Sequence, residues 1–208
     1  MGMHSLPISL TSHRIYASFL TANAWHRHNI EHIVAFVRAA EQKRFPLIIQ
    51  VFPWAITFSD GLLVHAAAHA ARHVSVLVAV HLDHAQDESL IRHAADNLPF
   101  DSIMVDMSHH DRAENLARTK ELVTHCHERG IATEAEPGRI EGGEDGIADT
   151  SDLEGVMTTA EDVEEFVGTG VDFLAPAFGN VHGEYGARGA TVGLGKVSFF
   201  FRFSYFCF

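Results

Sequence analysis

The sequence predicts an α/β protein built on a parallel sheet and folded as a single domain. Short runs of apolar and β-branched residues alternate with longer amphipathic segments, which is the pattern of strands followed by helices. The run at residues 74–82 is mostly hydrophobic, as expected of a strand that is buried on both faces of a parallel sheet. With 47% apolar and 20% charged residues among 208, the chain has the composition of an ordinary globular protein.

Six strands can be traced along the chain, at residues 16–21, 47–51, 74–82, 102–106, 131–135 and 171–177. The helices between them are expected at residues 29–42, 61–73, 88–95, 111–129 and 159–167. Apolar residues recur at helical spacing in the first helix, Gly130 ends the fourth at the position that glycine favours, and Thr159 begins the last. A glycine- and acid-rich loop is expected at residues 136–152, before the last helix.

The net charge limits the classes of binding partner, and the cysteine content indicates the redox state of the compartment. Fifteen basic against 27 acidic residues give a net charge of −12, which argues against a nucleic-acid or an anionic membrane surface as the main partner. The longest apolar run is far below the ~20 residues that a membrane helix needs. Cys126 and Cys207 form no disulfide framework and no thiolate metal site, and they fit a reducing compartment. We therefore expect a soluble cytoplasmic protein.

Chemically active side chains follow four successive strands of the predicted sheet. Because the carboxyl ends of parallel strands meet at one edge, we expect these side chains to lie close together. Imidazole and carboxylate groups suit a divalent metal, and imidazole favours zinc over magnesium. A single aspartate at a strand end is more often a helix cap, so the prediction depends on the whole set. Its members are His81, Asp83, His84, Asp106, Ser108, Glu134, Glu136, Asn180 and His182.

Four segments resemble the zinc-dependent class II ketose-bisphosphate aldolases, the family of fructose-bisphosphate aldolase. The resemblance covers about residues 17–189, and its motifs come in the family's order at the matching strand ends. It implies a TIM (β/α)8-type barrel, a phosphorylated sugar substrate in carbohydrate metabolism such as glycolysis, and a homodimer. The segments are Val80-His81-Leu82-Asp83-His84, residues 102–108, Glu134-Ala135-Glu136 with Glu144-Asp145-Gly146, and residues 178–185.

The resemblance also implies a set of metal ligands. His84 and His182 match two of the three histidines that hold the catalytic zinc ion in the family. Asp106 and Glu136 match carboxylates that hold a metal in an alternative or second position. The third zinc ligand is not identified in this sequence.

Catalytic and substrate-binding roles follow from the same motifs. Asp83 matches the acid/base that exchanges a proton with the aldehyde oxygen of the acceptor, and Glu144 matches the carboxylate that moves the proton on the ketone donor. Gly183 lies where family members meet the donor's phosphate and a monovalent cation, and Asn180 in the same segment is expected to bind substrate. The resemblance therefore predicts aldol cleavage of fructose 1,6-bisphosphate or a close analogue.

The positions of the lysines argue against the other mechanism of aldol cleavage, in which a lysine forms a Schiff base with the substrate. An imine-forming lysine must lie at the active edge of the sheet. The three lysines are instead placed before the second strand, within a helix and near the end of the chain: Lys43, Lys120 and Lys196. A different metal site, at His65, His69 and His73 on one helix face, is also conceivable, although a solvated face is the default reading of that spacing.

The sequence departs from the family at several points. A barrel of eight units typically takes ~250 residues, so we expect about six units, with an incomplete barrel at residues 1–196 and an atypical aromatic tail at residues 197–208. Bulky residues occupy 50–54, where the family has a small hydroxyl residue, and Gly186 stands where a lysine is frequent. Two alternatives remain open, a catalytically impaired or non-enzymatic fragment that retains partial metal binding, and an unrelated metal-dependent hydrolase.

Overall fold

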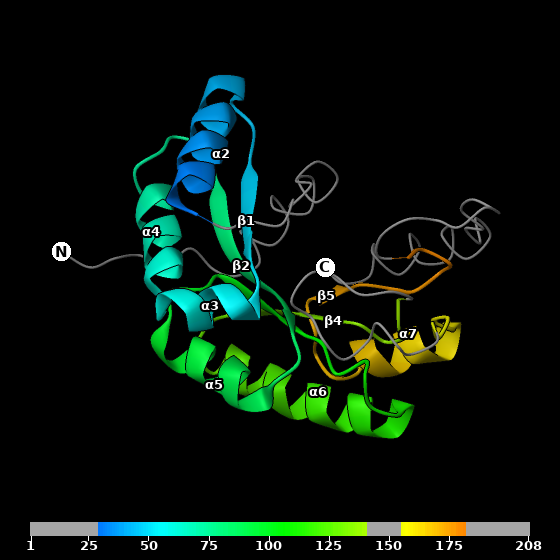
Figure 1. Cartoon of the computed structure of the whole chain (residues 1–208). Coiled ribbons are helices and arrows are strands. Elements are labelled where there is room, and N and C mark those ends of the chain that lie inside the picture. Colours follow the sequence, from blue (N-terminus) through cyan, green and yellow to red (C-terminus); the bar gives the residue numbers. More distant parts are fainter. Residues whose placement is uncertain (1–28, 141–154, 182–208) are drawn as a thin grey trace. The chain divides into compact units, whose positions relative to one another are not determined.

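The structure is a computed structural model that describes residues 29–140 and 155–181 (Figure 1). Its strands are β1 (Leu47–Val51), β2 (Val78–Ala85), β3 (Ser102–Val105), β4 (Ala132–Ala135) and β5 (Phe173–Leu174). Its helices are α2 (Ile30–Lys43), α3 (Pro53–Ser59), α4 (Leu62–Ala71), α5 (Glu88–Asn97), α6 (Arg112–His127) and α7 (Ala160–Val167). The strand expected at residues 16–21 lies outside the described residues.

The five strands form one sheet in the order β1-β2-β3-β4-β5, so the order in space follows the order along the chain. The outer pairs β1/β2 and β4/β5 are parallel, with Gln50 opposite His81 and Ala135 opposite Leu174. Because at least one helix intervenes between each strand and the next, the carboxyl ends of the strands come to the same edge. The predicted fold class is confirmed.

The chain divides into two compact units, each with its own packing. Met1–Met104 with Cys126–Ala132 form the first unit, and Val105–His125 with Thr133–Phe208 form the second. In the first, α4 packs against α2 and β2, and the short helix α3 packs against α4. In the second, the buried residues Val123, Ala135, Phe166 and Val171 form one apolar cluster.

Local hydrogen bonds explain where the helices begin. The side-chain oxygen of Asn29 accepts a bond from the His32 amide at 2.9 Å and so caps α2. Asp87 accepts bonds from two amides at the start of α5. Thr159 and Asp162 form a reciprocal capping box at the start of α7, which confirms the sequence-based start of that helix.

Three elements differ clearly from the sequence prediction, and one of them is β5, which has two residues where a strand at 171–177 was expected. Strand β2 starts at Val78 and continues to Ala85, whereas residues 74–82 were expected. The preceding segment is withdrawn from the sheet, because the amide and hydroxyl of Ser75 both donate to the carboxylate of Glu41. Helix α3 was not expected, and it begins at Pro53, whose fixed φ and missing N–H suit the first helical position.

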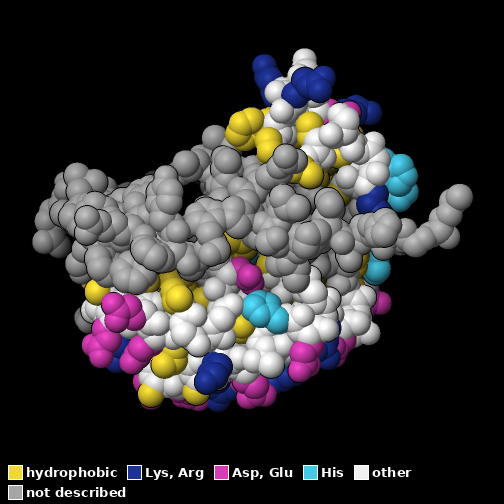
Figure 2. Space-filling model, turned by 180° about the vertical axis from the view of Figure 1, so that it is seen from behind, with side chains coloured by type: hydrophobic (Ala, Val, Ile, Leu, Met, Phe, Trp, Pro, Cys, Tyr) yellow, Lys and Arg dark blue, Asp and Glu magenta, His cyan; other side chains and the backbone are white. Residues whose placement is uncertain are grey.

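Charged side chains of both signs are interspersed over the lower part of the described surface in Figure 2. Ion pairs on the helices include Arg118 with Glu114, both on α6, and Arg112 of α6 with Glu165 of α7. Within the described ranges, no helix has both the length and the apolar character needed to cross a lipid bilayer.

Candidate metal centre

Asp83 and His84 lie near the end of strand β2, which finishes at Ala85. His84 is buried and has a φ of 47°, in the left-handed region that costs a residue with a Cβ roughly 1–2 kcal/mol. Strain of this kind is kept where surrounding structure imposes it, and it gathers at functional sites. Asp83 and His84 both lie within β2, whereas the sequence analysis placed them after the strand.

The imidazole of His84 is supported by an aromatic ring. Phe52, the N-cap residue of α3, is fully buried and stacks on His84 with 6.3 Å between the ring centroids. Phe52 is one of the bulky residues noted at positions 50–54 of the sequence. Phe52 therefore packs against the imidazole of His84, which is a candidate metal ligand.

Asp106 follows β3 and is almost completely buried. One carboxylate oxygen accepts two hydrogen bonds from Ser108, one from the amide at 3.1 Å and one from the hydroxyl at 2.6 Å. This tight turn fixes one oxygen of the Asp106 carboxylate. Ser108, predicted only as a strand-end residue, is thus the orienting partner of Asp106.

Glu136 follows β4 and is also buried. Its Oε1 accepts a hydrogen bond from the Ile140 amide at 2.6 Å, and its main-chain carbonyl accepts one from the side-chain amide of Asn115 at 3.0 Å. Asn115 is itself held by the hydroxyl of Thr119, one turn further along α6. The side chain and the main chain of Glu136 are therefore both fixed.

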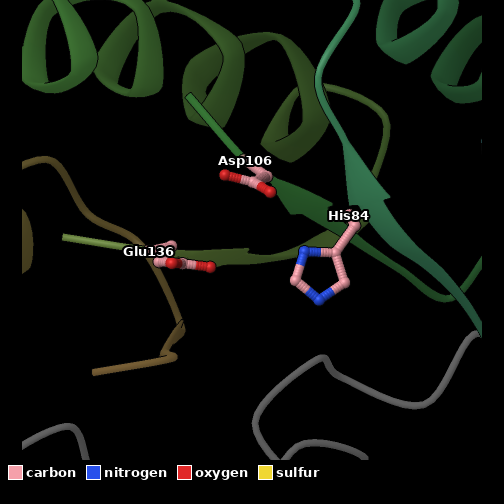
Figure 3. A group of neighbouring side chains, drawn as sticks. All are labelled: His84, Asp106 and Glu136. Carbon is pink, nitrogen blue, oxygen red and sulfur yellow. The ribbon is translucent and has the colours of Figure 1, made fainter. Parts of the chain in front are cut away.

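His84, Asp106 and Glu136 each offer a ligand atom, and these three atoms all lie within 4.8 Å of one another (Figure 3). Ligand atoms bound tetrahedrally to one zinc ion are about 3.3 Å apart, given Zn–N and Zn–O distances of ~2.0–2.2 Å. One imidazole and two carboxylates, all buried, are a donor set that fits a divalent cation of the zinc type.

A second histidine of β2, His81, lies between the hydroxyl of Ser102 and the carboxylate of Asp83. His81 is buried, its Nδ1 lies 2.7 Å from the hydroxyl of Ser102, and its Nε2 lies 3.8 Å from Oδ1 of Asp83. Burial lowers the pKa of His81, because desolvation of the imidazolium outweighs the attraction of the Asp83 carboxylate. His81 is therefore neutral at pH 7, and its neighbour Asp83 is partly exposed.

The remaining predicted site residues are placed as follows. Asn180 is described, and its side-chain oxygen accepts a hydrogen bond from the Phe178 amide at 2.9 Å, which closes its own turn. Glu144, His182 and Gly183 lie outside the described residues. The structure therefore brings together three of the four predicted metal ligands.

The histidines at positions 65, 69 and 73 agree with the simpler interpretation of their spacing, an exposed helix face. His65 and His69 are exposed on this helix, and His73 is exposed just beyond its end. Nδ1 of His73 lies 2.7 Å from the main-chain carbonyl of His69, so one ring nitrogen is already engaged. This side of α4 is a solvated helix face, as the sequence favoured.

Asn115 and Arg139 touch the site but were not singled out from the sequence. Asn115 lies one turn into α6, 21 residues from the carbonyl to which it donates, and Arg139 donates to carbonyls about 30 residues away. Only the folded chain reveals these partners. Arg139 comes three residues after Glu136, the carboxylate that follows β4. This position in the sequence could have marked Arg139 as a candidate.

Fold and donor set together define an α/β protein with a candidate divalent-metal site at the carboxyl ends of a parallel sheet. A sequence model described as fructose-bisphosphate aldolase class-II matches residues 16–195. The chain therefore belongs to the class II fructose-bisphosphate aldolase family, and the resemblance read from its motifs is confirmed.

Individual relatives agree with this assignment. A Coccidioides immitis protein provisionally named as a fructose-bisphosphate aldolase is 62% identical over 172 residues, covering 79% of this chain and 57% of that protein. The fructose-bisphosphate aldolase of Giardia intestinalis is 37% identical over 165 residues, covering 78% of this chain and 50% of the relative. A crystal structure from Coccidioides immitis, also provisionally assigned as this aldolase, superposes with a TM-score of 0.80 and 60% identity, covering 82% of this chain and 60% of that one. The chain thus spans between half and three fifths of the length of these relatives.

Proposed function

We propose that the protein carries out zinc-dependent aldol cleavage and condensation of a ketose bisphosphate. The substrate would be fructose 1,6-bisphosphate, giving dihydroxyacetone phosphate and glyceraldehyde 3-phosphate, or a close analogue. The observation that carries the proposal is the convergence of His84, Asp106 and Glu136 in a chain of this family. A cytoplasmic location and a homodimer are part of the same proposal, because they follow from the family.

His84 and His182 would hold the zinc ion, and Asp106 and Glu136 would supply the alternative or second position. The buried carboxylates favour this role, since burial without a cation would leave two negative charges close together in a poorly solvated place. When bound, zinc acts as a Lewis acid that stabilises the negative charge developing on the substrate's carbonyl oxygen.

Asp83 would exchange a proton with the aldehyde oxygen of the acceptor. Three features support this role: the residue precedes His84 in β2, it is more exposed than His84, and its carboxylate lies near the neutral His81. A proton carrier must reach the substrate without being consumed as a metal ligand, and partial exposure beside the ligand meets that need.

The ketone donor would be handled by residues of the later motifs. Glu144 would move the proton on the donor, and Gly183 with Asn180 would contact its phosphate region, next to a monovalent cation. These roles rest on the match of the motifs to the family.

The experiment that tests this proposal compares metal content and cleavage of fructose 1,6-bisphosphate in the same preparations. We expect the full chain to bind zinc and His84→Ala to lose it, whereas His65→Ala, which removes an exposed imidazole of α4, keeps it. Asp83→Asn should keep its zinc and lose cleavage by ~10²–10⁴-fold, the usual contribution of a positioned proton carrier.

Two results would count against the proposal in different ways. Equal zinc content in the wild type and His84→Ala would remove His84 from the site. Zinc binding by the wild type without measurable aldol cleavage would support the alternative, a fragment that keeps part of the metal site without the activity.

A further inference from the structure

Arg139 joins the two segments that carry the candidate carboxylate ligands. Its Nε donates to the main-chain carbonyl of Ser108 at 2.8 Å, and a terminal nitrogen lies 3.4 Å from the carbonyl of His110. Ser108 is the residue that orients Asp106, and Arg139 itself lies three residues after Glu136. A single guanidinium group therefore spans from one ligand segment to the other.

Each ligand segment is internally fixed before Arg139 connects them. Ser108 holds one oxygen of Asp106 within residues 106–108. The Ile140 amide holds one oxygen of Glu136 within residues 136–140. Because each carboxylate is tied to its own segment, the distance between the two segments sets the distance between the two carboxylates.

The main chain of Arg139 is anchored on its other side. Its amide and carbonyl form a two-way bridge with Val156, at 2.8 Å in each direction. The adjoining Gly138 allows this close approach, since a Cβ there would collide with the carbonyl of Val156 and lie 2.7 Å from the hydroxyl of Thr158. Residues 138 and 139 are thus held against residues 156–158, and only the Arg139 side chain is left to reach towards residues 108 and 110.

We propose that Arg139 is a positioning residue that holds Asp106 and Glu136 at the separation needed to share one divalent cation. The inference rests on the proposed function, because it assumes that these two carboxylates bind metal. The planar guanidinium can donate along two directions at once, and a lysine ammonium on a flexible stem does not reproduce that fork.

The sign of the change in metal affinity on removal of Arg139 distinguishes a positioning role from a purely electrostatic one. A positive charge near a cation site repels the cation, so removing Arg139 should strengthen metal binding if charge alone mattered. If Arg139 positions the ligands, its removal should weaken binding, because partners that orient metal ligands contribute 10–100-fold in affinity. The two effects act in opposite directions.

The experiment uses the full chain and titrates it with Co²⁺, followed by visible absorption, and with Zn²⁺ in competition with a chromophoric chelator. The variants are Arg139→Met, Arg139→Lys and Arg118→Met. Arg118 is the matched control, an arginine of α6 in the same unit whose side chain pairs with Glu114 on the helix surface. Far-UV circular dichroism and urea unfolding of the metal-free proteins verify that each variant is folded.

We expect Arg139→Met to bind Zn²⁺ ~10–100-fold more weakly and to show an altered Co²⁺ spectrum, because the ligand geometry changes. Arg139→Lys should be intermediate, and it carries the test if Arg139→Met does not fold. Arg118→Met should bind as the wild type does or slightly more tightly. Unchanged or tighter binding by both Arg139 variants would overturn the inference alone, whereas no metal binding by the wild type would overturn the proposed function and the inference with it.

Discussion

The ring of Phe52 packs against the imidazole of His84, with their planes inclined by only 27°. Phe52 comes directly after β1, and His84 is the next-to-last residue of β2, the neighbouring strand. The contact therefore joins two adjacent strand ends at the point where the backbone of His84 is strained. A buried aromatic ring restricts the orientations that the histidine can adopt, which is what a ligand or an acid/base group requires of its surroundings.

Replacement of Phe52 should be costly. We expect Phe52→Ala to lower the free energy of unfolding by about 3–5 kcal/mol, the usual loss for deleting a fully buried phenylalanine. Phe58→Ala is the matched control, because Phe58 is 84% exposed at the other end of α3 and should change stability by less than about 0.5 kcal/mol. Urea unfolding of both variants measures the difference, and equal values would show that Phe52 is not part of the core.

The fold could be predicted from the sequence where local signals agree with tertiary ones. Strand β1 matches the predicted range because its apolar run and its burial coincide, and α7 starts where Thr159 predicts because a cap acts over three residues. The start of β2 could not be predicted. It depends on the hydrogen bonds from Ser75 to Glu41, which is 34 residues away along the chain.

In the candidate site too, some features could be predicted from the sequence and others depend on residues distant along the chain. His84, Asp106 and Glu136 could be predicted because successive parallel strands bring their carboxyl ends to one edge, whatever the details of the loops. The left-handed backbone of His84 and the bridge from Arg139 could not, since a residue type does not reveal a partner 31 positions away.

The hydroxyl of Ser102 should determine the protonation pattern of His81. Because His81 is neutral and its Nε2 faces Asp83, we expect the proton on Nε2 and the Ser102 hydroxyl donating to Nδ1. Ser102→Ala would leave a buried acceptor unsatisfied and should lower the free energy of unfolding by ~1–3 kcal/mol. Long-range ¹H–¹⁵N spectra of the imidazoles identify the tautomer, and urea unfolding gives the energy.

Thr124→Ala provides the control for Ser102, because it deletes an exposed hydroxyl that donates to the carbonyl of Lys120 one turn back in α6. It should change stability by no more than about 0.5 kcal/mol. A proton on Nδ1 of His81 in the wild type would show that the assigned direction of the Ser102 bond is wrong.

The lysines should play no covalent part in the reaction. Among the described residues, Lys43 ends α2 and Lys120 lies within α6, so neither is at the carboxyl end of a strand. We expect borohydride in the presence of dihydroxyacetone phosphate to add no reduced adduct, and mass spectrometry of the intact chain measures this. A stoichiometric adduct that requires the ketone would contradict the metal mechanism.

Asp162 should make the stability of α7 depend on pH. Its carboxylate accepts bonds from the amide and hydroxyl of Thr159 and from the guanidinium of Arg112. Burial by itself would raise the pKa of Asp162, but the hydrogen bonds from Thr159 and Arg112 outweigh it and the pKa is lowered. The folded state therefore binds fewer protons than the unfolded state at mildly acidic pH, so the stabilisation is complete above the unfolded pKa of about 3.9 and is lost as the pH falls through the folded value.

Asp162→Asn should accordingly lower the free energy of unfolding by about 1 kcal/mol at pH 7, the typical contribution of a cap, and by progressively less below about pH 4. Glu161→Gln removes the same charge from the preceding residue of α7, which is 74% exposed and 3.9 Å from Arg112, and it should have little effect at either pH. Urea unfolding of the three proteins between pH 7 and pH 3 provides the comparison. A difference between wild type and Asp162→Asn that stays constant over this range would mean that the carboxylate's charge contributes nothing, and that the cap acts only through the geometry of its oxygen atoms.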